Sequence, residues 1–194
     1  MLVEGNRTTK TNIESMKTVK LLDREFRVSI SAEKIDKVIA QMAERMNEDL
    51  KGKDPLFICI LNGSFMFASD LMKQINVENS QITFMRLSSY DGMGTTGKVK
   101  KLMGFTEDLK DRTVVLLEDI VDTGITISNT LDQIKDYEAK EVLVATMLFK
   151  PEALIRDVKL DYVGMEIPND FIVGRGLDYD GMGRNLPDIY TVIE

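Results

Sequence analysis

Strand-like apolar runs that alternate with segments of helical spacing constrain the fold of this chain more than any other feature. Strands are expected at 56–61, 81–87, 113–117 and 141–149, and the run 56–61 is typical of a strand buried on both faces of a sheet. Strands that alternate with helices are joined by right-handed crossovers. We therefore expect an α/β fold with a mostly parallel central sheet flanked by helices.

Three helices are expected around these strands. The first begins after Ser31, a residue type that caps helix N-termini, and its apolar residues recur at helical spacing until Gly52. The second follows the tight turn 62–64 and covers about 65–75. The third begins near residue 125 and has its apolar residues on one side.

A chain of 194 residues is long enough for one well-cored domain and short for two. Residues 1–15 are polar and are expected to form a flexible tail, so that a single domain covers 16–194. The core of this domain is expected at about 30–160, and a small C-terminal hood mainly at 161–190.

A change of texture in the last third of the chain predicts this hood. Short β runs occur there at 162–167, 171–173 and 189–193, and the loop 174–187 lies between the last two. Another segment, 88–98, contains three glycines and little apolar content, so we expect a mobile loop there.

The charge and residue composition exclude several function classes. The chain carries 25 basic and 32 acidic residues, a net charge of −7, which disfavours a nucleic-acid partner. It has no histidine, which excludes a histidine base, a Ser-His-Asp triad and histidine metal ligands. Any metal must then bind to oxygen ligands, which favours Mg²⁺, Ca²⁺ or Mn²⁺.

The distribution of apolar residues bears on location. No apolar run approaches the roughly 18–20 residues that a membrane span requires, so no membrane partner is expected. The polar start of the chain does not look like a secretory signal. The single cysteine, Cys59, lies inside an apolar run and is interpreted as a buried small hydrophobe in a reducing compartment. These features predict a soluble, cytoplasmic protein.

An acidic and hydroxyl-rich motif follows the strand expected at 113–117. It begins with Glu118 and Asp119, continues with Asp122, and ends with Thr123-Gly124-Ile125-Thr126 at the start of a helix. Such a strand–glycine turn–helix junction presents free backbone N–H groups and a partial positive charge, which suit a phosphate. Carboxylates beside a phosphate suit sugar hydroxyls and a bound Mg²⁺. The motif therefore predicts a sugar phosphate bound together with a metal.

The string 114–126 closely resembles the 5-phosphoribosyl 1-diphosphate (PRPP) signature of the type I phosphoribosyltransferase family. Three further segments narrow the resemblance. Residues 61–64 resemble the pyrophosphate loop of that family, 88–90 its flexible catalytic loop, and 171–174 with 177–179 its purine-binding segment.

The likeness extends from about residue 30 to residue 193 and points to the hypoxanthine (hypoxanthine-guanine) branch of the family. It implies an enzyme of purine salvage that transfers the 5-phosphoribosyl group from PRPP to N9 of hypoxanthine, and of guanine, with release of pyrophosphate. The products would be IMP and GMP. It also implies Mg²⁺ as cofactor and a homodimer or homotetramer.

The resemblance also implies roles for the residues of the acidic motif. Glu118 and Asp119 match the carboxylates that hold the ribose 2′ and 3′ hydroxyls, and with Asp178 they are the expected metal ligands. Asp122 matches the candidate general base at purine N7. The cradle of the 5′-phosphate corresponds to five consecutive residues: Asp122, Thr123, Gly124, Ile125 and Thr126.

The purine and pyrophosphate sites are implied in the same way. Lys150 matches a lysine that donates to the purine 6-oxo group, and because an ammonium only donates, it rejects the 6-amino group of adenine. Phe171 matches the ring that stacks on the base, and Ile172 reads the base edge through its backbone. The other implied residues are Asp178 near the purine, Asn62, Gly63, Ser64 and Arg184 at the pyrophosphate, and Ser89 and Tyr90 on the flexible loop.

Three positions depart from the family pattern. Asn62 stands where many relatives have a lysine, and whether the Leu61–Asn62 peptide is cis is open. Arg175 stands where relatives often carry a larger neutral or aromatic residue, and residues 180–183 are smaller and richer in glycine than usual. These changes leave open the rigidity of the hood and the ranking of hypoxanthine, guanine and xanthine.

Two alternatives from other functional classes are considered on the same residues. A non-catalytic PRPP-binding regulatory protein would bind nucleic acid, whereas this chain is acidic and retains Asp122, Lys150 and Phe171. A receiver-type signalling domain explains neither the Thr-Gly-x-Thr cradle nor the last third of the chain.

Overall fold

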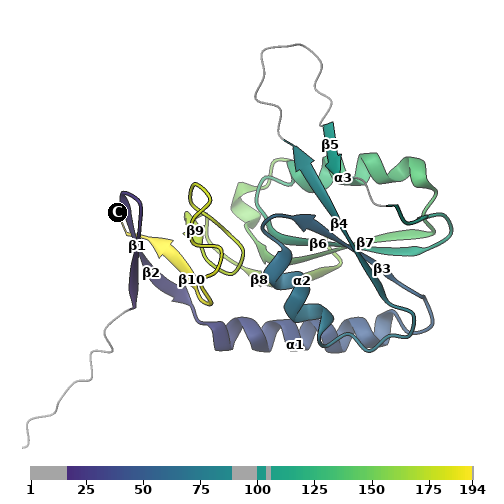
Figure 1. Ribbon diagram of the computed structural model, residues 1–194, viewed down its shortest axis with the longest axis horizontal. Helices are drawn as coiled ribbons and strands as arrows, with labels where there is room; N and C mark the ends of the chain where they lie inside the picture. The colour runs from purple at the N-terminus through teal and green to yellow at the C-terminus, as the bar shows by residue number, and fades with distance from the viewer. Residues whose placement is uncertain (1–16, 89–99, 104–105, 194) are drawn as a thin grey trace, which may run out of the picture.

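The computed structural model describes residues 17–88, 100–103 and 106–193 (Figure 1). The tail expected at 1–15 lies outside the described residues, as do Ser89, Tyr90 and almost all of the loop expected at 88–98. No helix within the described ranges is both long enough and apolar enough to cross a membrane.

Six strands form the main sheet, in the spatial order β5-β4-β3-β6-β7-β8. All neighbours pair in parallel except β5, which runs antiparallel to β4, so the predicted mostly parallel sheet is confirmed. Its strands are β3 (Leu56–Leu61), β4 (Gln81–Ser88), β5 (Lys100–Met103), β6 (Thr113–Val121), β7 (Glu141–Phe149) and β8 (Tyr162–Glu166). Two short 3₁₀ turns, η1 (Lys135–Tyr137) and η2 (Pro151–Ala153), precede and follow β7.

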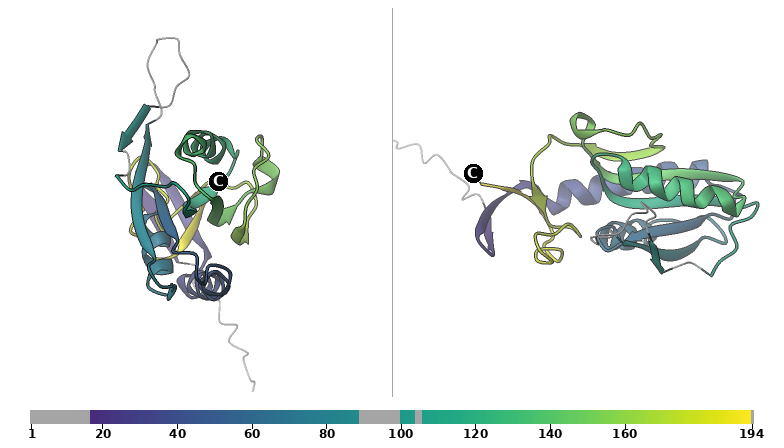
Figure 2. Two further views of the ribbon diagram at one scale, coloured as in Figure 1. Left: turned by 90° about the vertical axis from the view of Figure 1, so that its right-hand side faces the viewer. Right: turned by 90° about the horizontal axis from the view of Figure 1, so that it is seen from above.

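Helices cover both faces of the main sheet (Figure 2). On one face, α1 (Ala32–Asp49) and α2 (Phe65–Met72) pack on Phe57 and Cys59 of β3. On the other face, α3 (Ile125–Ile134) buries its apolar side against the alternate residues of β3 and β6. All three helices were expected, although α2 ends earlier than predicted.

The sequence sets the start of α1. Ser31 is the N-cap residue, and its side chain accepts a hydrogen bond from the Lys34 amide (3.4 Å), which satisfies one of the free N–H groups of the first turn. The buried residues of α1 recur every three or four positions and form a single apolar side: Ile35, Ile39, Met42, Ala43 and Met46.

A second, antiparallel sheet lies beside the carboxyl ends of the main strands and forms the hood sheet (Figure 1). Its order is β1-β2-β10-β9, from β1 (Thr18–Leu21), β2 (Arg24–Ile30), β9 (Ile172–Val173) and β10 (Ile189–Val192). The hood sheet has its own small apolar cluster around Phe26, Val173 and Tyr190. Residues 174–188, between β9 and β10, form the hood loop.

The border between core and hood differs from the expectation in two respects. Residues 162–166, expected in the hood, form β8 and pair in parallel with β7 of the main sheet. The N-terminal hairpin of β1 and β2, which was not expected, supplies half of the hood sheet. Apart from the buried Phe26, the residues of its strands are exposed or partly buried, and hence the strands lack a long apolar run.

The acidic pair also lies differently from the prediction. The third strand, expected to end at residue 117, continues to Val121 as β6, so Glu118 and Asp119 are the last part of a strand and do not belong to a turn. The pairing of β6 with β3 ends at Leu117, whereas its pairing with β7 continues through Glu118 to Val121, so among the described strands β7 alone supports the backbone around the acidic pair.

Candidate functional site

Three segments meet at the edge of the main sheet that faces the hood. They are the β3–α2 loop (residues 62–64), the end of β6 with the β6–α3 loop (residues 122–124), and the hood loop. Ligands of open α/β sheets bind beyond the carboxyl ends of the strands, and these segments lie there.

Glu118 and Asp119 provide two neighbouring buried carboxylates with few hydrogen-bond donors to stabilise their charge. Glu118 is buried, and among the described residues its Oε2 has no hydrogen-bond partner. Burial, with a smaller contribution from the Asp119 charge, raises the pKa of Glu118 well above its ordinary value. Burial likewise raises the pKa of Asp119 to about 6, although the Ile120 N–H donates to its Oδ1 (2.9 Å). Burial without a compensating hydrogen bond at Oε2 therefore disfavours the charged form of Glu118.

The β6–α3 loop is shaped to receive an anion. Gly124 adopts φ of 77° and caps α3, and a Cβ at this position would overlap the Arg156 carbonyl. The Thr123 carbonyl accepts hydrogen bonds from the N–H groups of Ile155 (3.0 Å) and Arg156 (2.9 Å), which fix the loop. The first N–H groups of α3 have no partner within the helix, although that of Ile125 donates to Thr123 Oγ1 (3.4 Å), and such a helix start suits a phosphate.

The β3–α2 loop lies directly between β6 and the hood loop. The Leu61–Asn62 peptide is cis. Any Cβ on Gly63 would overlap the Asp119 carboxylate, and a Cβ on Gly176 of the hood loop would overlap the Gly63 carbonyl. The three segments are therefore in van der Waals contact at Gly63.

Ser64, expected at the pyrophosphate site, does not present its side chain there. The residue is fully buried, and its hydroxyl donates to the Ile60 carbonyl and lies 3.1 Å from Cys59 Sγ. Only its backbone N–H can then serve a ligand. Cys59 itself is buried in the core, and this burial raises the pKa of its thiol to about 11.

Lys150 and Asp122 form a second polar group beside the acidic pair. Lys150 is buried, and its Nζ donates to the Asp170 carbonyl (2.8 Å) and lies 3.8 Å from Asp122 Oδ2. The Asp122 side chain is 46% exposed and so remains accessible to a ligand. The Lys150 ammonium, which can only donate hydrogen bonds, and the accessible Asp122 carboxylate therefore lie side by side.

Phe171 extends an exposed ring from the segment that precedes β9. The ring is 42% exposed, and its centroid lies 5.7 Å from that of Tyr179 in an edge-on arrangement. The Arg24 guanidinium lies over both rings, 5.7 Å from Phe171 and 5.3 Å from Tyr179, and the Tyr179 hydroxyl donates to Asp23 (2.7 Å). The adjacent Ile172 packs its side chain into the core, so only its backbone faces a ligand.

Asp178 and Arg184 form an ion pair on the hood loop. Arg184 Nη2 lies 2.7 Å from Asp178 Oδ1, and the Gly181 N–H donates to Asp178 Oδ2 (2.7 Å). Arg184 Nη1 also donates to the Gly176 carbonyl (2.7 Å). The positive charge of Arg184 lowers the pKa of Asp119, and the negative charge of Asp178 raises it. Both hood residues therefore act on the acidic pair.

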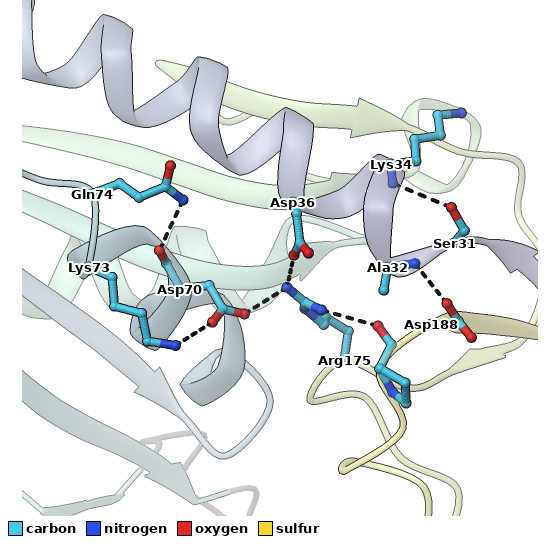
Figure 3. Close-up of polar contacts among 10 residues, drawn as sticks. Ser31, Ala32, Lys34, Asp36, Asp70, Lys73, Gln74, Arg175 and Asp188 are labelled. Atoms are coloured by element: carbon cyan, nitrogen blue, oxygen red, sulfur yellow. Dashed lines mark hydrogen bonds and ion pairs between the residues drawn. The ribbon is translucent and has the colours of Figure 1, made fainter.

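Several residues that shape the site were not expected from the sequence. The hairpin residues Asp23 and Arg24 contact the exposed rings, and Asp170 orients Lys150. Asp188 accepts a hydrogen bond from the Ala32 N–H (2.7 Å) and joins the hood to the start of α1 (Figure 3). These contacts join parts of the chain that are far apart in sequence, so no local motif could indicate them.

The acidic side chains of the site are candidate ligands of the expected Mg²⁺. Among the residues that the structure describes, no group of three or more acidic or cysteine side chains surrounds a common point. Mg²⁺ is commonly held by one or two carboxylates together with substrate oxygens and water. The buried, unpartnered Glu118 oxygen beside Asp119 fits that mode of binding.

Comparisons with known proteins give a consistent result. The family model described as "Phosphoribosyl transferase domain" matches residues 30–180. The chain is 38% identical, over 169 residues, to the hypoxanthine-guanine phosphoribosyltransferase of Streptococcus pneumoniae, covering 87% of this chain and 93% of that protein. For the protein of the same name from Streptococcus mutans the identity is 41% over 170 residues, with the same coverage.

A solved structure is similar over most of its length. The crystal structure of a hypoxanthine phosphoribosyltransferase from Staphylococcus aureus superposes with a TM-score of 0.80 at 34% identity. The superposition covers 86% of this chain and 90% of the Staphylococcus aureus chain.

Proposed function

Since the chain belongs to the phosphoribosyl transferase family, we propose that it transfers the 5-phosphoribosyl group of PRPP to N9 of hypoxanthine and guanine. The reaction forms a nucleotide, IMP or GMP, and releases pyrophosphate. This is an enzyme of purine salvage, and the arrangement of its side chains supports a role for each part of the site.

The ribose and its 5′-phosphate would bind at the end of β6. The free N–H groups of the β6–α3 loop and of the first turn of α3 suit the phosphate, with the Thr123 and Thr126 hydroxyls as further donors. Glu118 and Asp119 would accept hydrogen bonds from the ribose hydroxyls. Their charge also favours the cationic character that the ribose ring acquires as pyrophosphate leaves.

The purine would lie between the core and the hood sheet. Lys150 would donate to the 6-oxo group, because its Nζ is held near Asp122 and has further N–H donors available. Phe171 would stack on the base, and the Ile172 backbone would pair with the base edge. Asp122 would remove the proton at N7, since its carboxylate is accessible and within reach of the same base.

Pyrophosphate would leave between the β3–α2 loop and the hood loop. The backbone N–H groups of Gly63 and Ser64, with Asn62 and the Arg184 guanidinium, supply donors on both sides of this space. Mg²⁺, when bound with PRPP, would neutralise charge on the departing pyrophosphate. Its protein ligands would come from Glu118, Asp119 and Asp178, directly or through water.

The buried Oε2 of Glu118, which has no partner among the described residues, carries this proposal, because Glu118 lies beside Asp119 on the strand that leads into the β6–α3 loop. Family membership supports in addition a homodimer or homotetramer. The buried, reduced thiol of Cys59 is compatible with a cytoplasmic location.

One assay tests the proposal. The purified protein is mixed with PRPP, Mg²⁺ and, separately, hypoxanthine, guanine, xanthine or adenine, and nucleotide formation is followed. We expect turnover of 6-oxopurines and none of adenine. Comparable turnover of adenine would contradict the role of Lys150, whereas PRPP binding without turnover of any base would favour the regulatory alternative.

A further inference from the structure

Arg175 joins the hood loop to both helices on one face of the main sheet (Figure 3). Its guanidinium pairs with Asp36 of α1 and with Asp70 of α2, the latter at 2.8 Å. Its Nη1 also donates to the Pro187 carbonyl (3.2 Å). The Arg175 side chain is 8% exposed and that of Asp70 24%, so this pair is shielded from solvent more than an ordinary surface pair, whereas Asp36 is 61% exposed.

The backbone next to Arg175 contacts the proposed pyrophosphate site. Arg175 has φ of 51°, and its N–H donates to the Leu186 carbonyl (2.8 Å). The following residue, Gly176, has φ of 105° and packs directly on the Gly63 carbonyl. The Gly176 carbonyl in turn accepts the hydrogen bond from Arg184. A movement of Arg175 would therefore reach Gly63 and Arg184 through one peptide unit.

The ion pair of Arg175 with Asp70 links the hood loop to the β3–α2 loop through α2. Asp70 belongs to the helix that starts immediately after the β3–α2 loop, so loop and helix move together. Arg175–Asp70 and Gly176–Gly63 are thus two adjacent contacts between the hood loop and the same element. Together they define the distance between the two walls of the pyrophosphate site.

We propose that Arg175 is a positioning residue, which holds the hood loop against the β3–α2 loop and thereby sets the affinity for the pyrophosphate group of PRPP. This inference rests on the proposed function. Phe171 and the Ile172 backbone, the proposed contacts of the purine, precede Arg175 in the chain and are held by β9 and the hairpin. The affinity for the base is therefore expected to depend on Arg175 far less than the affinity for PRPP.

The test is the variant Arg175→Gln, which keeps a hydrogen-bonding side chain but removes the charge. Calorimetry with pyrophosphate and Mg²⁺ measures the dissociation constant, and steady-state kinetics measure KM for PRPP and for hypoxanthine. We expect the pyrophosphate Kd and the KM for PRPP to rise about tenfold, with the KM for hypoxanthine within about twofold of the original value. Arg175→Lys should restore part of the lost affinity.

A second variant keeps the test valid if Arg175→Gln does not fold. Asp70→Asn removes one partner and leaves Arg175 paired with Asp36, so we expect about a threefold rise in the pyrophosphate Kd. Lys73→Gln is the matched control, because Lys73 also pairs with Asp70 (2.9 Å) but is exposed and does not reach the hood. We expect it to bind pyrophosphate like the unmodified protein.

The outcomes separate this inference from the proposed function. If the unmodified protein neither binds PRPP nor forms nucleotide, the proposed function fails. If it is active while Arg175→Gln and Asp70→Asn bind pyrophosphate unchanged, Arg175 has no positioning role. Equal losses of affinity for PRPP and hypoxanthine would also overturn the inference, because they would indicate general damage to the fold.

Discussion

At the scale of single residues, the two carboxyl groups at the end of β6 are unfavourable for the protein without its ligands. Burial is the largest cause that raises the pKa of Glu118 and that of Asp119, and among the described residues the Glu118 Oε2 has no partner. In the proposed complex, ribose hydroxyls and Mg²⁺ would stabilise the ionised forms. Substrate binding would then recover stability that the free protein gives up.

We expect Asp119→Asn to stabilise the free protein at neutral pH while it lowers activity at least a hundredfold. The folded-state pKa of Asp119, about 6, lies above its ordinary value of 3.8. The contribution of neutral Asp119 to the stability of the folded protein is therefore fully present below about pH 4 and is lost as the pH rises through 6. An asparagine does not ionise and can keep the hydrogen bond from Ile120. The free energy of unfolding should therefore exceed that of the unmodified protein by up to roughly 3 kcal/mol at pH 7.

Urea unfolding at pH 4 and pH 7 measures this difference. The matched control is Asp132→Asn, because Asp132 is exposed and pairs with Lys135 on the helix surface (2.6 Å). A stability difference between Asp119→Asn and the unmodified protein that is the same at both pH values would contradict a raised pKa.

At the scale of elements, Gly63 makes the contact between the β3–α2 loop and β6 possible. We expect Gly63→Ala to raise the Kd for PRPP at least tenfold, because the new methyl group overlaps the Asp119 carboxylate and must displace it or the loop. Calorimetry with PRPP measures the effect. Gly52→Ala is the control, since a Cβ at Gly52 meets no atom within 4 Å.

Both glycine variants are expected to lose some stability, for different reasons. Gly52 has φ of 73°, where a side chain costs about 1–2 kcal/mol, whereas Gly63 has no such backbone requirement. Unchanged PRPP binding by Gly63→Ala would mean that the carboxylate and the loop can separate without functional loss.

The elements themselves were predictable to the extent that they are buried. Helices cover both faces of β3, so its residues form an unbroken apolar run. This run, 56–61, predicts the bounds of the strand correctly. β1 and β2 are half-exposed strands of the hood sheet, and their charged and apolar residues alternate without such a run. The length of β6 was underestimated because acidic residues usually end a strand, whereas here they continue it.

Site residues follow the same division. The cluster from Glu118 to Thr126 is contiguous, so its spacing alone could indicate a phosphate and a sugar. The ion pair of Arg175 with Asp36 joins residues 139 positions apart, and the contact of Arg24 with Phe171 joins the hairpin to β9. Nothing in either local sequence indicates its partner, so only the folded chain reveals these contacts.

At the scale of the whole molecule, the hood sheet has an apolar cluster of its own around Phe26, while Ile172 and Ile189 of the same sheet pack into the main cluster. Phe26 is fully buried in the hood cluster and contacts the proposed stacking residue, Phe171, with ring centroids 6.2 Å apart. The hood is fastened to the core by its two buried isoleucines in the main cluster and by polar contacts at Arg175, Asp188 and Lys150. The part of the hood around Phe26 lies outside the main cluster and can open locally while the main sheet stays folded.

We expect Phe26→Ala to destabilise the hood by about 3–5 kcal/mol, because it removes a fully buried aromatic ring. Hydrogen exchange measured by mass spectrometry should show faster exchange in β9 and β10 and unchanged protection in β3 and β6. The KM for hypoxanthine should rise as Phe171 loses its support. Phe57→Ala, equally buried in the main sheet, is the control and should accelerate exchange throughout. Synchronous exchange of hood and main sheet in Phe26→Ala would show that the two unfold as one unit.

The apolar cluster around Phe26 also bears on how such a protein can change its preference among nucleobases. Random mutagenesis confined to the hood sheet would vary the surface offered to the base and leave the strands that carry the acidic pair intact. Mutagenesis of β6 would instead lower the activity toward every base at once, because each base receives its phosphoribosyl group from the same PRPP. A laboratory selection for new bases should therefore accumulate its successful changes in β1, β2, β9 and β10 and at Lys150, the proposed contact of the 6-oxo group.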